Sequence, residues 1–252
     1  MKKFLLTSVV ALVSVVAVNA QNNPKVWPMP AELPFRPAGV KVTVFPYPRA
    51  EWVERVKRSN DAAQTQNRTQ SIKLVFDGDS ITDGWHGGGQ KIWQERYAKY
   101  GAFNFGIGGD RTENVLWRLS QGQMSSLQPK LVAIMIGTNN IGNSAEDIID
   151  GVTAIVAEYR KLCPDAVILL QAIFPRNEKA DHPWRAKIKE VNAAIAKLDD
   201  GDKVVFVDFS DKFLQPDGTL GKDIMPDFLH PNASGYQIWA DAIQPYIDKY
   251  LQ

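Results

Sequence analysis

The stretch that decides the fold is residues 72–82, which read IKLVFDGDSIT. An apolar run, Ile72–Phe76, is followed at once by a polar loop, Asp77–Thr82, that carries one serine. The run is short, rich in branched side chains and without regular polar alternation, as expected of a strand that is covered on both faces. A buried strand that ends in a polar loop favours a parallel sheet flanked by helices.

The same pattern recurs along the chain. Further strands are predicted at Ala102–Phe105, Leu131–Ile136, Val167–Ile173 and Val204–Val207. Between them, helical spacing of apolar residues predicts helices at Gln90–Tyr100, Thr112–Ser120, Ala145–Leu162, Pro183–Leu198 and Ser234–Leu251. Alternation of strand and helix indicates βαβ units with right-handed crossovers. We therefore expect an α/β fold, a doubly wound three-layer α/β/α domain of about five parallel strands, with its ligand at the carboxyl ends of the strands.

The first twenty residues have the composition of a targeting segment. Lys2 and Lys3 precede an apolar run, Phe4–Val18, and the small residue Ala20 follows shortly after it. This order predicts a signal peptide over residues 1–20, cleaved after about Ala20. The alternative is a membrane anchor, but the run of about 15 residues is shorter than the roughly 20 that a spanning helix needs. We expect a secreted or periplasmic bacterial protein with no integral membrane segment after cleavage.

Residues 21–70 are expected to form a Pro-rich N-terminal extension plus one helix packed on the domain of residues 71–252. Seven prolines between positions 21 and 50 favour an extended stretch. Apolar spacing predicts a helix from Ala50 to about Ala63, and the polar residues 64–71 are expected to be a loop.

Composition excludes several classes of function. The chain has 29 Lys and Arg against 28 Asp and Glu, so no broad basic field favours a nucleic-acid partner. A single cysteine, Cys163, can form neither an internal disulfide nor a cysteine-rich metal site. The near-average apolar and charged fractions, 44% and 23%, are those of a soluble globular protein.

The loops after the predicted strands carry residues suited to acyl transfer. Ser80 stands where a helix begins, so its hydroxyl and its backbone N–H are expected to face the ligand. Gly109, after the second strand, and Asn139, after the third, can each donate a hydrogen bond to a developing oxyanion. Each residue also has a plainer interpretation, as a helix cap for the serine and as turn residues for the other two.

Asp227 and His230 lie three residues apart near the C-terminus, a spacing that brings a carboxylate and an imidazole onto one side of a turn. Asp227 can accept a hydrogen bond from one ring nitrogen while the other takes a proton from a serine. The alternatives are a structural Asp–His pair or half of a metal site. A hydrolytic metal site needs about three protein ligands, and neither His86 nor His182 has the spacing to supply them, so no metal is expected.

Taken in order, these residues resemble the four sequence blocks of the SGNH (GDSL) hydrolase family. The matching stretches are Gly78-Asp79-Ser80, Gly108-Gly109-Asp110, Gly137-Thr138-Asn139 and Asp227-Phe228-Leu229-His230. The resemblance covers about residues 71–250, which would then be an SGNH hydrolase domain. It implies a flavodoxin-like α/β/α fold without a cofactor. It also implies a catalytic triad of Ser80, Asp227 and His230. The implied oxyanion hole consists of Ser80, Gly109 and Asn139.

Within that family the chain is most similar to the catalytic subunits of platelet-activating-factor acetylhydrolase. The likeness rests on Asn104–Asp110, Val115–Leu119 and Gly137–Asn140, and on Asp227–Pro231 except at its last residue. What the resemblance implies is a serine esterase that forms an acyl-enzyme on Ser80. The resemblance also allows a homodimer, because similar enzymes associate in pairs.

The substrate is expected to be a small-molecule or glycan ester. For an exported bacterial enzyme we favour acetyl esters on carbohydrates, and the alternative is a lysophospholipase or a lipid esterase like platelet-activating-factor acetylhydrolase. Candidate substrate-binding residues are Asp79, Trp85, Phe174, Arg176 and Phe228. A different class, a carbohydrate- or lipid-binding module without activity, predicts a degraded triad, whereas every expected residue is present.

Overall fold

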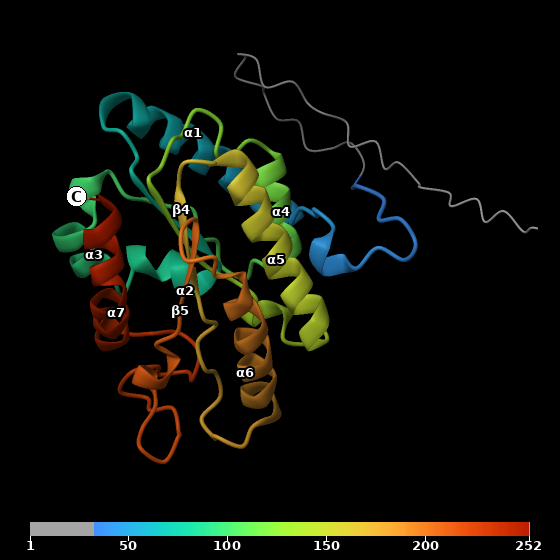
Figure 1. Ribbon diagram of the computed structural model, residues 1–252, viewed down its shortest axis with the longest axis vertical. Coiled ribbons are helices and arrows are strands. Elements are labelled where there is room, and N and C mark those ends of the chain that lie inside the picture. Colours follow the sequence, from blue (N-terminus) through green and yellow to red (C-terminus); the bar gives the residue numbers. More distant parts are fainter. Residues whose placement is uncertain (1–32, 252) are drawn as a thin grey trace, which may run out of the picture.

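The chain folds around a five-stranded parallel sheet of order β2-β1-β3-β4-β5. The structure is a computed structural model that describes residues 33–251, so the predicted signal peptide lies outside the described residues. The strands are β1 Leu74–Gly78, β2 Phe103–Asn104, β3 Leu131–Met135, β4 Val167–Gln171 and β5 Val204–Val207. The expected three-layer α/β/α fold is confirmed (Figure 1).

Helices cover both faces of the sheet (Figure 1). One face carries α1 Val53–Thr69, α4 Thr112–Ser120, α5 Ala145–Leu162 and α6 Pro183–Ile195. The other carries α2 Ser80–Asp83, α3 Gln90–Arg96 and α7 Ala233–Leu251. Short 3-10 turns lie at Val42–Val44, Ala50–Trp52, Gly84–His86, Ala98–Tyr100, Thr138–Asn140, Ala196–Leu198 and Ser210–Phe213. None of the helices within residues 33–251 is long and apolar enough to cross a bilayer.

Each central strand sends alternate side chains into the two layers of the core. Along β3, Val132 and Ile134 pack with the α4–α6 layer, whereas Leu131, Ala133 and Met135 pack with the α3–α7 layer. All five residues are almost completely buried. A strand that is covered on both faces therefore has apolar residues at every position, which is why the sequence shows an unbroken run there.

The prediction of a loop at residues 64–71 was wrong, because α1 continues to Thr69. The polar side chains of its last turns bond to neighbouring loops instead of ending the helix. Gln66 Nε2 donates to the Gly101 carbonyl at 3.0 Å, and Asn67 Nδ2 donates to the Ser126 carbonyl at 3.0 Å. Tertiary contacts thus outweigh the local signal of polar residues.

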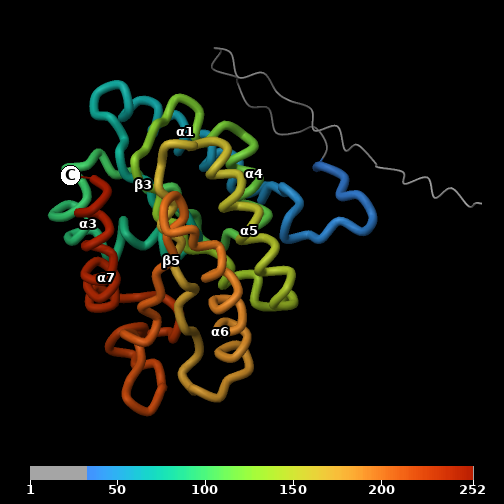
Figure 2. The backbone as a smooth tube through the Cα atoms, viewed as in Figure 1, coloured from blue at the N-terminus to red at the C-terminus, as the bar shows by residue number. Residues whose placement is uncertain are grey.

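Residues 41–47 of the N-terminal extension lie against α4 and α5, whereas the described residues before them loop away from these helices (Figure 2). Lys41 Nζ bonds to Glu146 at 2.8 Å and to Asp150 at 2.7 Å on α5. Tyr47 is held to α4 by both of its backbone polar groups. Its N–H donates to the Glu113 carbonyl at 3.0 Å, and its carbonyl accepts from Asn114 Nδ2 at 2.9 Å.

A buried ion network lies where β1 ends. Arg118, on α4, donates through Nη2 to Asp77 at 2.7 Å and through Nε to Asp110 at 2.8 Å. Gln123 Nε2 donates to the second oxygen of Asp77 at 2.8 Å, and the Tyr159 hydroxyl also donates to that oxygen. All five side chains are buried. The Arg118 guanidinium ties α4 to β1 and to the loop after β2, and the Asp77 carboxylate adds α5 through Tyr159.

The variant Arg118→Met should lose roughly 3–5 kcal/mol of unfolding free energy, because it leaves the carboxylates of Asp77 and Asp110 buried without a cation. Urea denaturation followed by circular dichroism measures the change. The matched control Arg58→Met removes an exposed arginine from α1 and should stay within about 0.5 kcal/mol of wild type. Equal stability of the two variants would contradict a structural role for the network.

Candidate active site

Ser80 lies at the carboxyl end of β1, on the first turn of a short helix. The strand ends at Gly78, where a Cβ atom would come within 2.3 Å of both the Met135 carbonyl and the Thr82 hydroxyl, so only glycine fits. Asp79 then caps α2, because its Oδ1 accepts the Ile81 N–H at 3.0 Å. The Ser80 side chain is therefore held half-buried at the rim of the sheet.

Ser80, His230 and Asp227 form a continuous chain of hydrogen bonds. Ser80 Oγ lies 2.8 Å from His230 Nε2, and His230 Nδ1 lies 2.6 Å from Asp227 Oδ2. The other oxygen of Asp227 accepts the His230 N–H at 2.8 Å and the Leu229 N–H at 3.1 Å. Residues 150 positions apart are thus in direct contact. This contact pattern is the one by which a base activates a serine and a carboxylate orients the base.

The Asp227 carboxyl has a pKa below its ordinary value. Its partial burial acts to raise the pKa, but the bonds that it accepts from the backbone N–H and the ring of His230, together with the Leu229 N–H, outweigh that effect. Asp227 therefore stays ionised under mildly acidic conditions, as a carboxylate that orients an imidazole must.

The two loops that carry Gly109 and Asn139 are joined beside Ser80. Asn139 Nδ2 donates to the Asp110 carbonyl at 2.9 Å, which uses one of the two amide hydrogens. A Cβ built on Gly108 would lie 3.9 Å from the Ser80 Cβ, so this loop passes next to the serine. Gly109 has a φ of +78°, a conformation that favours glycine. The arrangement exposes Gly109 at the same rim as Ser80.

Arg176 holds the third loop from the other side. Its Nη1 donates to the Thr138 carbonyl at 2.8 Å, and its guanidinium carbon lies 4.8 Å from the centre of the Trp184 ring. Burial lowers the pKa of Arg176, while the nearby carboxyls of Asp79 and Asp227 act to raise it. The side chain is therefore a half-buried cation within the field of the site, with Thr138 as its bonded partner.

Asp79 is fully buried beside Ser80. Its Oδ2 has no hydrogen-bond partner among residues 33–251. Burial raises the pKa of Asp79 to about 7, although the Ile81 N–H acts to lower it, and the negative charge of Asp110 adds to the rise. Burial therefore keeps this carboxyl protonated to a higher pH than an exposed aspartate.

The other three candidate substrate-binding residues lie in or against the core. Trp85 and Phe174 are 0% and 2% exposed and pack among aromatic rings, so neither presents a face to a substrate here. Phe228 is half-buried at a φ of +59°, and its carbonyl accepts the Asn177 N–H at 2.9 Å. This bond helps to fix the turn that carries His230.

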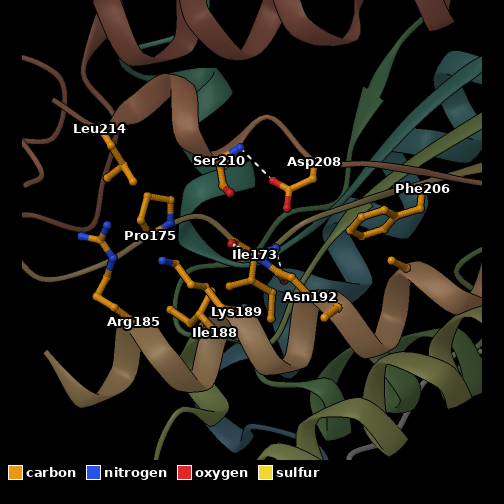
Figure 3. A pocket seen from close by; sticks show the side chains of 12 residues that line it. Ile173, Pro175, Arg185, Ile188, Lys189, Asn192, Phe206, Asp208, Ser210 and Leu214 are labelled. Atoms are coloured by element: carbon orange, nitrogen blue, oxygen red, sulfur yellow. Dashed lines mark hydrogen bonds between the residues drawn. The ribbon is translucent and has the colours of Figure 1, made fainter. Parts of the chain in front are cut away.

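A pocket of about 630 Å³ adjoins the rim. Gly109 and Asn139 line it, together with residues of the N-terminal extension and of α4. Its polar and charged lining residues also include Tyr47, Arg49, Glu51, Arg111, Glu113 and Asn114. A smaller pocket of about 210 Å³ lies between α6 and the end of β5 (Figure 3). It contains none of the predicted site residues. Among residues 33–251, no cluster of three His, Cys, Asp or Glu side chains could hold a metal ion.

Comparison with known proteins identifies the family. The sequence profile of the GDSL-like lipase/acylhydrolase family matches residues 76–238, which include both Ser80 and His230. The chain belongs to this family. The match begins within β1, so the N-terminal extension and α1 lie outside it.

Known relatives of this GDSL hydrolase include mammalian and avian enzymes. Platelet-activating factor acetylhydrolase IB subunit alpha1 of Rattus norvegicus is 38% identical over 171 residues, 68% of this chain and 72% of the relative. Subunit alpha2 of Gallus gallus is 38% identical over 147 residues, 58% of this chain and 64% of the relative. These relatives agree with the resemblance inferred from the sequence.

Solved structures share the fold. A GDSL-like lipase of Bacteroides thetaiotaomicron superposes with a TM-score of 0.60 at 23% identity, over 75% of this chain and 97% of that one. An acetylxylan esterase of Geobacillus stearothermophilus gives a TM-score of 0.56 at 22% identity, over 71% and 94%. At this identity the similarity supports the fold of the GDSL hydrolase and not its substrate.

Sequence reasoning missed the groups that support the site. Arg118 interrupts the apolar sequence Val115–Leu119, and Asp77 directly follows the apolar residues Leu74–Phe76, so both could be recognised as charges that need partners if buried. Arg49, which lines the larger pocket, left no comparable signal, because it follows a proline in an extended stretch.

Asp79→Asn should make the stability of the GDSL hydrolase less dependent on pH. Folding raises the pKa of Asp79 from 3.8 to about 7, so the folded wild type binds more protons than the unfolded chain and loses stability as pH rises through that range. Asparagine cannot ionise but still accepts the Ile81 N–H. The unfolding free energy of the variant relative to wild type should therefore increase between about pH 4 and about pH 7, as urea denaturation at each pH measures. A constant difference over this range would contradict the raised pKa.

Proposed function

We propose that this GDSL hydrolase is a serine esterase that cleaves short-acyl, chiefly acetyl, esters on carbohydrates through an acyl-enzyme on Ser80. The observation that carries the proposal is the hydrogen-bonded chain of 2.8 Å and 2.6 Å that links Ser80 Oγ, His230 and Asp227. It supplies a nucleophile, a general base and an orienting carboxylate in contact, at the rim where a parallel sheet binds ligands.

The reaction proceeds in two halves. Ser80 Oγ attacks the ester carbonyl carbon while His230 Nε2 takes its proton, and Asp227 stabilises the resulting imidazolium. His230 then returns that proton to the leaving alcohol, which departs as the C–O bond breaks. Water attacks the acyl-enzyme in the second half, with His230 again as the base, and releases the free acid and the Ser80 hydroxyl.

Charge on the carbonyl oxygen is stabilised by an oxyanion hole. Its proposed donors are the backbone N–H groups of Ser80 and Gly109 and the second amide hydrogen of Asn139. The supporting observation is that Gly109 and Asn139 line one pocket and that their loops are joined by the bond from Asn139 to Asp110. Losing one such donor costs roughly 3 kcal/mol of transition-state stabilisation.

The lining of the larger pocket favours a carbohydrate as the alcohol. Tyr47, Arg49, Glu51, Arg111 and Asn114 offer hydrogen-bonding and charged groups on one side of the proposed oxyanion hole. Hydroxyl-rich sugars satisfy such groups, whereas an alkyl chain would leave them unpaired. Structural relatives described as acetylxylan esterases are consistent with this class. Export through the predicted signal peptide would bring the enzyme to glycans outside the cytoplasm.

A lipid ester is the second candidate. Leu33 lines the same pocket and is 49% exposed, and Phe35 nearby in sequence is 88% exposed. Exposed apolar side chains beside a pocket can take up an alkyl chain. The relatives at 38% identity are subunits of platelet-activating factor acetylhydrolase, which keeps this class in consideration.

Ser80→Ala and His230→Ala should each abolish the burst of nitrophenol that accompanies acylation by a nitrophenyl acetate ester, because neither variant can form the acyl-enzyme. Stopped-flow absorbance measures the burst. A fluorophosphonate probe should label wild type at Ser80 and leave Ser80→Ala unlabelled, as mass spectrometry of the peptides reports. Full activity in Ser80→Ala would refute the assignment of the nucleophile.

Specificity constants should separate the two substrate classes. We expect kcat/KM to be higher for acetylated xylooligosaccharides than for an acetyl glycerophospholipid, and to fall from acetyl to butyryl to hexanoyl nitrophenyl esters. Acetate release and nitrophenol absorbance measure the two series. The variant pair Leu33→Ser and Phe35→Ser serves as the control, since it should affect only a lipid substrate. A preference for the phospholipid that these variants remove would favour the lipid candidate.

A further inference from the structure

One peptide group in the loop after β2 is bonded on one side only. The Gly108 carbonyl accepts a hydrogen bond from Arg49 Nη1 at 3.1 Å. The N–H of the same peptide belongs to Gly109, and within residues 33–251 it donates to no backbone or side-chain acceptor. In a trans peptide the carbonyl and the N–H point in opposite directions. The bond to Arg49 therefore aims the Gly109 N–H away from the extension.

A nearby peptide shows the contrast. Arg55 also donates to this loop, from Nη2 to the Gly106 carbonyl at 3.4 Å. The N–H of that peptide belongs to Ile107 and donates to the Gly78 carbonyl at 3.2 Å, so it is already used inside the fold. Two arginines of the N-terminal region thus bond to the loop, but only Arg49 bonds to the peptide whose N–H remains available.

The Arg49 guanidinium has a fixed place. Its Nη2 and Nε donate to Glu51 at 2.8 Å and 3.2 Å, and its carbon lies 5.5 Å from the centre of the Trp52 ring. A Cβ atom on Gly109 would come within 2.2 Å of Arg49 Nη1, so the guanidinium packs directly on the glycine. These contacts hold both the cation and the peptide that it bonds.

A cation at a peptide carbonyl also strengthens the N–H on the other end. Hydrogen bonds from ionised donors are shorter and stronger than neutral ones, and bonds in series polarise one another. A donor that is already oriented toward a developing oxyanion needs no reorganisation when the charge forms. Arg49 thus both aims and polarises the Gly109 N–H.

We propose that Arg49 is a positioning residue of the proposed esterase, acting through the Gly108–Gly109 peptide to orient one donor of the oxyanion hole. The inference rests on the proposed function. Arg49 precedes residues 76–238, which match the family, so a segment outside the family's shared region completes the catalytic machinery of this chain.

The test is steady-state kinetics on a nitrophenyl acetate ester, whose small alcohol makes little use of the pocket. Arg49→Met should lower kcat roughly tenfold, a part of the hundredfold or more that loss of a whole donor costs, and should leave KM within about twofold. Arg49→Lys keeps a cation that can reach the carbonyl and should recover part of the loss. Lys41→Met is the matched control, since it loosens the same extension from α5 without contact to Gly108, and it should keep the wild-type kcat.

Two outcomes would overturn the inference while leaving the esterase intact. One is an unchanged kcat with a raised KM in Arg49→Met, which would make Arg49 a substrate-binding residue. The other is an equal fall of kcat in Lys41→Met, which would reduce Arg49 to a general anchor of the extension. Absence of both esterase activity and fluorophosphonate labelling in wild type would instead refute the proposed function, and this inference with it.

Discussion

The geometry of the site depends on the ionic hydrogen bonds that the buried Arg118 guanidinium makes to two carboxylates. It bonds Asp77 at the end of β1 and Asp110 directly after the exposed Gly109, so one side chain fixes the relative positions of two loops at the sheet rim. A buried ion group of this kind adds little net stability compared with apolar packing, but its directional bonds permit one arrangement. The benefit here is geometric, because Asp110 also accepts the Asn139 amide through its carbonyl.

Parallel topology supplies the second constraint. Every strand of such a sheet ends at the same edge, so the loops after β1, β2 and β3 meet there without any long-range signal in the sequence. His230 comes from outside the sheet and must be brought to this edge separately. A tight turn does so, in which Asp227 accepts two backbone N–H groups and Phe228 adopts a positive φ. The resulting 2.8 Å contact between Ser80 and His230 joins the two constraints.

These two constraints also explain what the sequence could predict. Strand runs and the loops that follow them were enough to predict the fold and to expect Ser80, Gly109 and Asn139 at one rim, because parallel topology brings these loops together. Asp227 and His230 follow no strand of the sheet, so their role was expected from their spacing and from the family resemblance. The ends of helices were harder to predict. In α1, for example, the side chains of Gln66 and Asn67 form hydrogen bonds with loops that are distant in sequence. The residues of the substrate pocket were the hardest to predict from the sequence. Trp85 is of a residue type that often binds sugars, and only its surroundings in the fold show that it belongs to the core.

The site has two parts, one within residues 76–238, which match the family, and one outside them. The proposed nucleophile, base and oxyanion donors lie within residues 76–238, and the buried network around Arg118 joins the ends of the loops that carry Ser80 and Gly109. Tyr47, Arg49 and Glu51 lie outside that region and line the pocket beside them. A serine esterase that forms an acyl-enzyme needs the nucleophile, the base and the oxyanion donors whatever its substrate is. The leaving alcohol, in contrast, is recognised by the residues of the pocket around them. Differences in substrate among related hydrolases are therefore expected to arise in segments like this extension, which can change without disturbing the ion network beneath the rim.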